Sequence, residues 1–154
     1  MGDMKLAILS PLHRAVRQVM LSLEEAIIDA GLDVRPDEGH ALSYIGTYGP
    51  CPTGNVQRVL GVKRSTVTSL LDRLVRRGLI IRQGDPSDGR VVLVQVTAAG
   101  RRLVERLDAC ALKLEQRIAE QIGTRDRAAL HRILAAIDQV TGVTVVDHHS
   151  RQEP

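Results

Sequence analysis

Residues 58–100 read RVLGVKRSTVTSLLDRLVRRGLIIRQGDPSDGRVVLVQVTAAG, and the spacing of their apolar side chains changes partway along. Residues 64–77 have the apolar spacing of an amphipathic helix, and Gly78 is a typical helix stop. Residues 79–81 and 91–96 are instead rich in β-branched side chains, with the turn-forming residues 84–89 between them. This stretch therefore predicts a helix followed by a β-hairpin.

Apolar stripes with helical spacing also occur on both sides of this stretch. They predict helices over residues 10–30, 36–48, 53–60, 97–122 and 124–141. Ser10 and Thr53 are candidate N-caps. The apolar stripes of the first helix and of the last two helices exceed what the helices and hairpin between them could cover. A second subunit is therefore expected to bury these stripes.

The predicted fold is mainly α with a small β-hairpin wing (α+β), a winged helix-turn-helix with N- and C-terminal dimerisation helices. We expect an N-terminal dimerisation helix in 1–33, the DNA-binding domain at 34–98, C-terminal dimerisation helices at 99–142 and a flexible tail at 143–154.

The composition narrows the class of partner. The chain has 154 residues, of which only 1% are aromatic, so its core must come from aliphatic side chains. Aromatic platforms for unstacked bases are therefore scarce, which argues against single-stranded nucleic acid. No apolar run is long enough to span a membrane, and no secretion signal begins the chain, so we expect a cytoplasmic protein.

The positive charge is concentrated in the middle of the chain. Residues 58–90 contain eight basic and three acidic residues, a net charge of +5, whereas the whole chain carries +3 and the remainder therefore −2. A basic segment inside a slightly acidic frame is typical of a module that binds duplex DNA, because neutralising phosphates supplies much of the affinity.

The helix over 64–77 has a polar face that could lie in the major groove. Its polar side chains suit base edges and phosphates, although an ordinary solvated helix face would show the same pattern. The candidate DNA-binding residues of this helix and its start are Lys63, Arg64, Ser65, Thr66, Thr68, Ser69, Arg73, Arg76 and Arg77. Asp88 and Arg90 are the candidates in the hairpin loop, and Thr53 and Gln57 those in the preceding helix.

Three segments together resemble the MarR family of bacterial transcription regulators. They are the helix and strand start at 65–80, the loop Asp85-Pro86-Ser87-Asp88-Gly89-Arg90, and the helix entry Val96-Thr97-Ala98-Ala99-Gly100. The resemblance implies a homodimeric, ligand-responsive repressor that binds a pseudo-palindromic operator. It also implies that the helix over 64–77 enters the major groove and that Arg90, oriented by Asp88, enters the minor groove.

The resemblance also implies a pocket for a small-molecule inducer, the usual effector in this family. His13 and Arg17 lie one turn apart in the first helix, and Tyr44 and Tyr48 one turn apart in the second. They are candidates for a phenolic or aromatic acid, but the tyrosines could equally fill gaps in the core.

Other functions find little support in the sequence. Cys110 is expected to be a buried, inert thiol. Cys51 is expected to lie in an accessible Pro-Cys-Pro loop, where redox sensing is a hypothesis. We expect no metal site, no cofactor and no enzyme activity, because the motifs for them are missing. The alternative is a winged-helix module for protein–protein interaction that does not read DNA.

Overall fold

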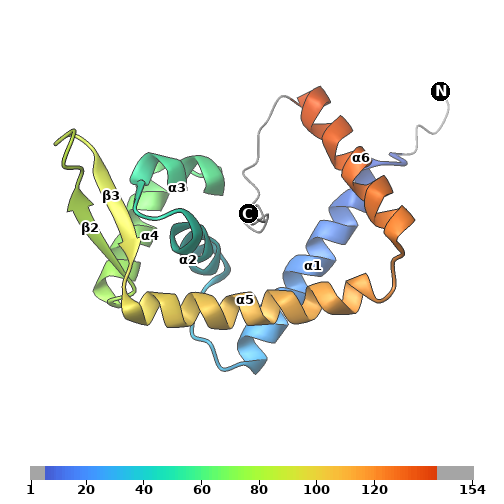
Figure 1. The fold of residues 1–154 in the computed structure, drawn as a ribbon, viewed down its shortest axis with the longest axis horizontal. Coiled ribbons are helices and arrows are strands. Elements are labelled where there is room, and N and C mark those ends of the chain that lie inside the picture. Colours follow the sequence, from blue (N-terminus) through green and yellow to red (C-terminus); the bar gives the residue numbers. More distant parts are fainter. Residues whose placement is uncertain (1–5, 142–154) are drawn as a thin grey trace.

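The computed structural model describes residues 6–141, which form six helices and a small antiparallel sheet that lies at one end of the molecule (Figure 1). The expected tail at 143–154 lies outside the described residues. The elements in chain order are α1 Leu9–Asp29, α2 Pro36–Tyr48, β1 Cys51–Pro52, α3 Thr53–Leu60, α4 Arg64–Arg76, β2 Ile80–Gly84, β3 Val92–Val96, α5 Ala98–Ala119 and α6 Thr124–Thr141. The predicted class, mainly α with a hairpin wing, is confirmed.

The sheet is the wing together with one additional short strand. β2 and β3 form the predicted hairpin, in register from Ile80 opposite Val96 to Gly84 opposite Val92. β1 pairs with the other edge of β3, with Cys51 opposite Val94, so the strand order is β1-β3-β2. The expected Pro-Cys-Pro loop is therefore wrong, because this segment contributes a strand.

The core of the winged part is almost entirely aliphatic, as the composition predicts. Helices α2 and α4 bury their apolar sides against each other and against the sheet. Its fully buried apolar side chains are Leu42, Ile45, Val56, Leu70, Leu71, Leu74, Ile80 and Val94. The side chain of Tyr44, with 6% exposed, is the aromatic member of this cluster.

The wing is tied to both neighbouring helices by two glycines and a threonine. Gly78 ends α4 in the left-handed conformation, with φ of 66°. Thr97 Oγ1 donates to the carbonyl of Gly78 at 2.7 Å and accepts from the amide of Gly100 at 3.0 Å, so Thr97 caps α5. A Cβ at position 100 would lie 2.0 Å from the carbonyl oxygen of Leu79, so only glycine fits there.

Two other expected caps are wrong. Helix α1 begins at Leu9, with Ile8 in the N-cap position, so Ser10 lies inside the helix. Helix α3 begins at Thr53 itself, and Pro52 occupies the N-cap position. Neither helix shows a side-chain cap hydrogen bond.

The outer helices carry the apolar side chains that the chain does not bury. Figure 1 shows α6 standing apart from the winged part, and neither α1 nor α6 has a buried residue. The exposed large apolar side chains of these helices include Leu9, Val16, Met20, Ile28, Leu130, Ile133, Leu134 and Val140. In the described part of the chain, no helix is both long and apolar enough to cross a membrane.

Candidate nucleic-acid interface

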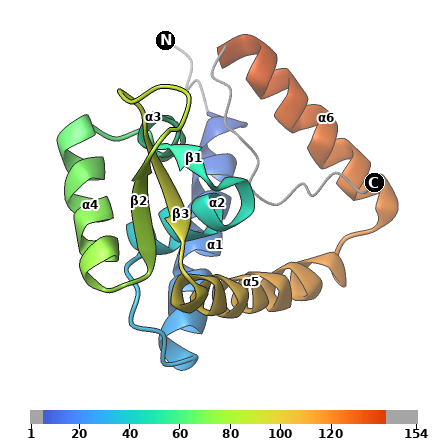
Figure 2. The same cartoon turned by 60° about the vertical axis from the view of Figure 1, so that its left-hand side comes forward.

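Helix α4 has one buried and one exposed side, as its spacing predicts. Val67, Leu70, Leu71 and Leu74 are buried in the core. The predicted contact residues that remain exposed on this helix and at its start are Lys63, Arg64, Ser65, Thr66, Thr68, Ser69 and Arg76. Figure 2 shows α4 beside the hairpin, so this polar side and the wing belong to one unit.

Two hydroxyls on the exposed side are already oriented. Thr68 Oγ1 donates to the carbonyl of Arg64 and Ser69 Oγ to that of Ser65, both at 3.0 Å. A hydroxyl that donates to its own helix keeps its oxygen lone pairs free to accept. These two residues therefore present acceptors, which suit the exocyclic amino groups of cytosine and adenine in the major groove.

The loop of the wing is organised by its own aspartates. Asp85 Oδ1 accepts from the amides of Ser87 at 2.7 Å and Asp88 at 3.3 Å. Hydrogen bonds from Ser87 hold the pKa of the Asp85 carboxyl below its ordinary value, so this acceptor stays charged at neutral pH. The turn is thus fixed before any partner binds.

Asp88 holds Arg90 at the end of this turn. Its Oδ1 accepts from the backbone amide of Arg90 at 3.0 Å and from Nε at 3.2 Å. The Arg90 side chain is still 92% exposed, so its guanidinium projects into solvent. The expected pairing of Asp88 with Arg90 is confirmed, whereas its contact with DNA stays a prediction.

An ion pair braces the wing against α4. Arg82 Nη1 in β2 lies 2.6 Å from Asp72 Oδ1 in α4, and its Nη2 donates to the carbonyl of Thr68 at 3.5 Å. The sequence analysis missed this pair, although the alternation of β2 does place Arg82 on the same side of the strand as Ile80. The brace fixes the angle between the two parts of the candidate interface.

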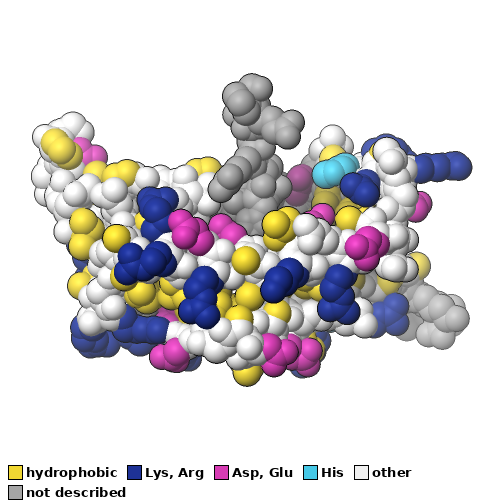
Figure 3. All heavy atoms as spheres, turned by 60° about the horizontal axis from the view of Figure 1, so that its bottom comes forward, with side chains coloured by type: hydrophobic (Ala, Val, Ile, Leu, Met, Phe, Trp, Pro, Cys, Tyr) yellow, Lys and Arg dark blue, Asp and Glu magenta, His cyan; other side chains and the backbone are white. Residues whose placement is uncertain are grey.

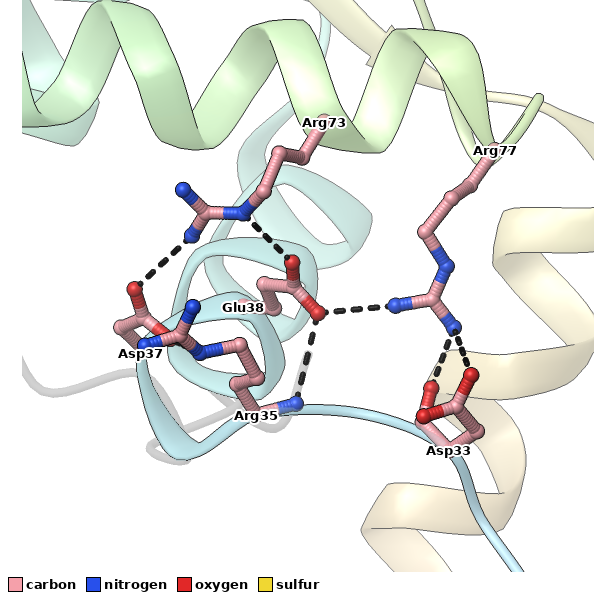
Figure 4. Close-up of polar contacts among 6 residues, drawn as sticks. All are labelled: Asp33, Arg35, Asp37, Glu38, Arg73 and Arg77. Atoms are coloured by element: carbon pink, nitrogen blue, oxygen red, sulfur yellow. Dashed lines mark hydrogen bonds and ion pairs between the residues drawn. The ribbon is translucent and has the colours of Figure 1, made fainter.

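Arg73 and Arg77, also predicted to contact DNA, differ from the other candidates on this helix because acidic side chains already pair with both. Both face α2 and surround the carboxylate of Glu38 (Figure 4). Arg73 also reaches Asp37 at 3.1 Å, and Arg77 contacts the backbone carbonyl and side chain of Asp33. Their charges are already balanced, so they are poor candidates for reading bases.

The preceding helix contributes less than expected. Thr53 and Gln57 are half-buried in α3, where Val56 anchors the helix in the core. Arg58 in the same helix is exposed. In the described part of the chain, Arg58, Lys63, Arg64 and Arg76 make no ion pair, so these cations are available to phosphates.

Basic side chains also lie outside residues 58–90. Figure 3 shows Lys and Arg side chains in a row across the face where α5 comes forward. The exposed basic residues of α5 are Arg101, Arg102, Arg106, Lys113 and Arg117. The slightly acidic frame predicted from net charge therefore contains a locally basic helix.

The four candidate ligand residues lie on two helices, α1 and α2. Tyr44 is buried, and its ring centroid lies 5.0 Å from that of Tyr48, which is 40% exposed. Burial raises the pKa of the Tyr44 hydroxyl. His13 and Arg17 are exposed on α1. None of the four lines the surface hollows of about 580 and 480 Å³ beside the start of α1 and the end of α5.

Both cysteines are buried. This confirms the expectation for Cys110 and corrects that for Cys51, which pairs in β1 and is 3% exposed. Burial raises the pKa of the Cys51 thiol, so little reactive thiolate forms at neutral pH. Among residues 6–141, no group of three or more His, Cys, Asp or Glu side chains could hold a metal ion.

Helix α4, with one buried and one exposed side, follows the short helix α3 and precedes the β2–β3 hairpin. This arrangement defines a winged helix-turn-helix. Residues 35–92 match the model of the MarR family. Over 130 residues the chain is 30% identical to the multiple antibiotic resistance protein MarR of Escherichia coli, covering 82% of this chain and 90% of that protein. The chain belongs to the MarR family.

Two further relatives agree with this assignment. The structure of the transcriptional repressor CouR bound to a 23-mer DNA duplex superposes with a TM-score of 0.70 at 27% identity, covering 88% of this chain and 99% of that one. The transcriptional repressor NicR of Pseudomonas putida is 25% identical over 60% of this chain and 59% of its own length. The chain covers 59% of the length of NicR, and 47% and 60% of the lengths of two Bacillus subtilis regulators that it also matches.

Proposed function

We propose that the protein is a transcriptional repressor that binds duplex DNA as a homodimer. The observation that carries this proposal is the joint geometry of α4 and the wing, in which a polar helix face and an exposed arginine share one braced unit. CouR, a protein of similar fold at 27% identity, has been seen bound to a DNA duplex, which supports the same use of this surface here.

In this proposal α4 lies in the major groove and the wing loop lies over the adjacent minor groove. Ser65, Thr66, Thr68 and Ser69 face the bases. Lys63, Arg64 and Arg76 face phosphates, because they are exposed cations without acidic partners in the described residues. Arg90 enters the minor groove, where a narrow groove concentrates negative potential.

A second copy of the chain covers the apolar sides of the outer helices. Exposed apolar residues on α1 and α6 include Met20 at 58% and Ile133 at 50%. A surface of this extent is unusual on a monomer in solution. An interface around a two-fold axis would bury both helices and present two winged units to a pseudo-palindromic site.

The proposed effector that controls DNA binding is a small phenolic or aromatic acid. Tyr48 supports this, because its ring is 40% exposed and rests on Tyr44, which leaves an aromatic surface open to a ligand. Arg17, exposed on α1, would supply a cation for the carboxylate. Titrating salicylate into the protein–DNA complex tests this proposal: release at millimolar concentration is expected, and a complex that stays intact contradicts it.

The DNA proposal is tested by selection from a pool of random duplexes. We expect enrichment of a pseudo-palindromic sequence whose binding weakens steeply with salt. If no sequence is enriched and no duplex binds even at low salt, the winged fold serves protein–protein interaction instead.

A further inference from the structure

We propose that Glu38 determines the DNA specificity of the protein by holding Arg73 and Arg77 away from phosphates. This inference rests on the proposed DNA binding. In this role Glu38 is a positioning residue, because it acts through the two arginines and touches no base. The observation behind the proposal is the cluster around the buried carboxylate of Glu38, which joins the start of α2 to α4 (Figure 4).

Glu38 is the one buried charged side chain among the described residues, with 2% exposed. Its carboxylate accepts three hydrogen bonds, from the backbone amide of Arg35 at 3.3 Å, from Arg73 Nε at 3.0 Å and from Arg77 Nη1 at 2.8 Å. A buried carboxylate is tolerated only when it is paired in this way. Its position is therefore set by both helices at once.

The two arginines attach to different oxygens of the same carboxylate. Arg73 binds Oε1 and Arg77 binds Oε2, and the two residues lie one turn apart along α4. Rotating α4 about its axis, or sliding it by one turn, would break at least one of these contacts. Glu38 thereby fixes which side of α4 faces outward, the side that carries Ser65, Ser69 and Arg76.

The cluster is also electrically neutral. Asp33, Asp37 and Glu38 supply three negative charges, and Arg35, Arg73 and Arg77 supply three positive charges. The side chains of Arg73 and Arg77 are still 30% and 34% exposed. They are long enough to turn toward solvent if Glu38 no longer holds them, and phosphates would then attract them regardless of base sequence.

The variant that tests this is Glu38→Gln. The amide keeps the size of the side chain and one acceptor oxygen, but it presents a donor to one of the two guanidiniums and carries no charge. One arginine in each subunit then keeps only its ion pair with the exposed Asp33 or the half-exposed Asp37, which solvent screens, so it can turn to DNA and add up to two phosphate contacts per dimer. On duplex without the selected sequence, the slope of log K against log salt steepens by about 1.8, and affinity at 0.1 M salt rises by up to about 60-fold.

Affinity for the selected sequence should change less, so the ratio of specific to non-specific affinity falls. Asp37→Asn is the matched control, because it removes a negative charge from the residue next to Glu38. The Asp37 side chain is half-exposed and makes a single contact with Arg73. This variant should change the ratio little. Arg73→Gln and Arg77→Gln are each added to Glu38→Gln, and the double variant that removes the released arginine should restore the slope toward that of the wild type.

The outcomes separate this inference from the proposed function. If Glu38→Gln matches Asp37→Asn, or if both affinities fall in parallel with the melting temperature, Glu38 serves the fold alone and the inference is wrong. If Glu38→Gln does not fold, the single variant Arg77→Gln is measured instead. Its slope of log K against log salt should equal that of the wild type, and a slope shallower by about 1.8 overturns the inference. A wild-type protein that binds no duplex overturns the proposed function itself.

Discussion

Replacing Arg90 by alanine removes an exposed cation at the end of the wing loop. The side chain is 92% exposed and contacts only Asp88, so its loss leaves the core intact and the melting temperature unchanged. In the proposed complex of a dimer with DNA, this substitution removes two electrostatic contacts. The slope of log K against log salt should then become shallower by about 1.8.

The loss of affinity follows from that slope. If the two contacts act through counterion release alone, affinity falls by about 60-fold at 0.1 M monovalent salt and by about 9-fold at 0.3 M. The assay is fluorescence anisotropy of the selected duplex over a salt series. Arg117→Ala is the control, because it removes an exposed arginine from α5, far along the chain from the wing. A slope for Arg90→Ala equal to that of the wild type would refute the role of the wing.

Three further predictions concern stability, assembly and reactivity. Gly100→Ala should lower stability by about 1–3 kcal/mol in urea unfolding, because its Cβ would overlap the carbonyl of Leu79, whereas Gly84→Ala, with open space around it, should be far milder. Leu134→Glu should shift the protein toward monomer in sedimentation, and an unchanged dimer would argue against α6 as the interface. Cys51 should react slowly with iodoacetamide at pH 8 in the native protein and quickly in urea, since burial raises its pKa and blocks access; rapid native labelling would contradict this.

Local patterns in the sequence predicted the parts of the fold that depend on near neighbours. The apolar spacing of 64–77 gave the correct buried side of α4, and the β-branched runs gave the hairpin. The start of the long helix at Thr97 was also local, since the structure begins α5 at the next residue. The pairing of Asp88 with Arg90 was likewise local, since only one residue separates them.

The errors came from contacts between distant residues. The pairing of Arg73 with Glu38 could not be predicted, because the helical pattern shows which way a side chain points but not what it meets, and Glu38 lies 35 positions away. The Pro-Cys-Pro segment looked like an exposed loop, and only the arrangement of the whole sheet places Cys51 against β3. Whether the four candidate ligand residues meet could not be predicted either, because spacing within α1 and within α2 says nothing about the distance between the two helices.

The central claim is that α4 and the wing together form the surface that contacts DNA. Hydrogen–deuterium exchange of the protein with and without the selected duplex tests it most directly. The account predicts slower exchange in the segment leading into α4 at 61–64 and in the wing loop at 85–91, with α6 unchanged. Protection confined to α5 or α6, with the wing loop exchanging as in the free protein, would contradict it.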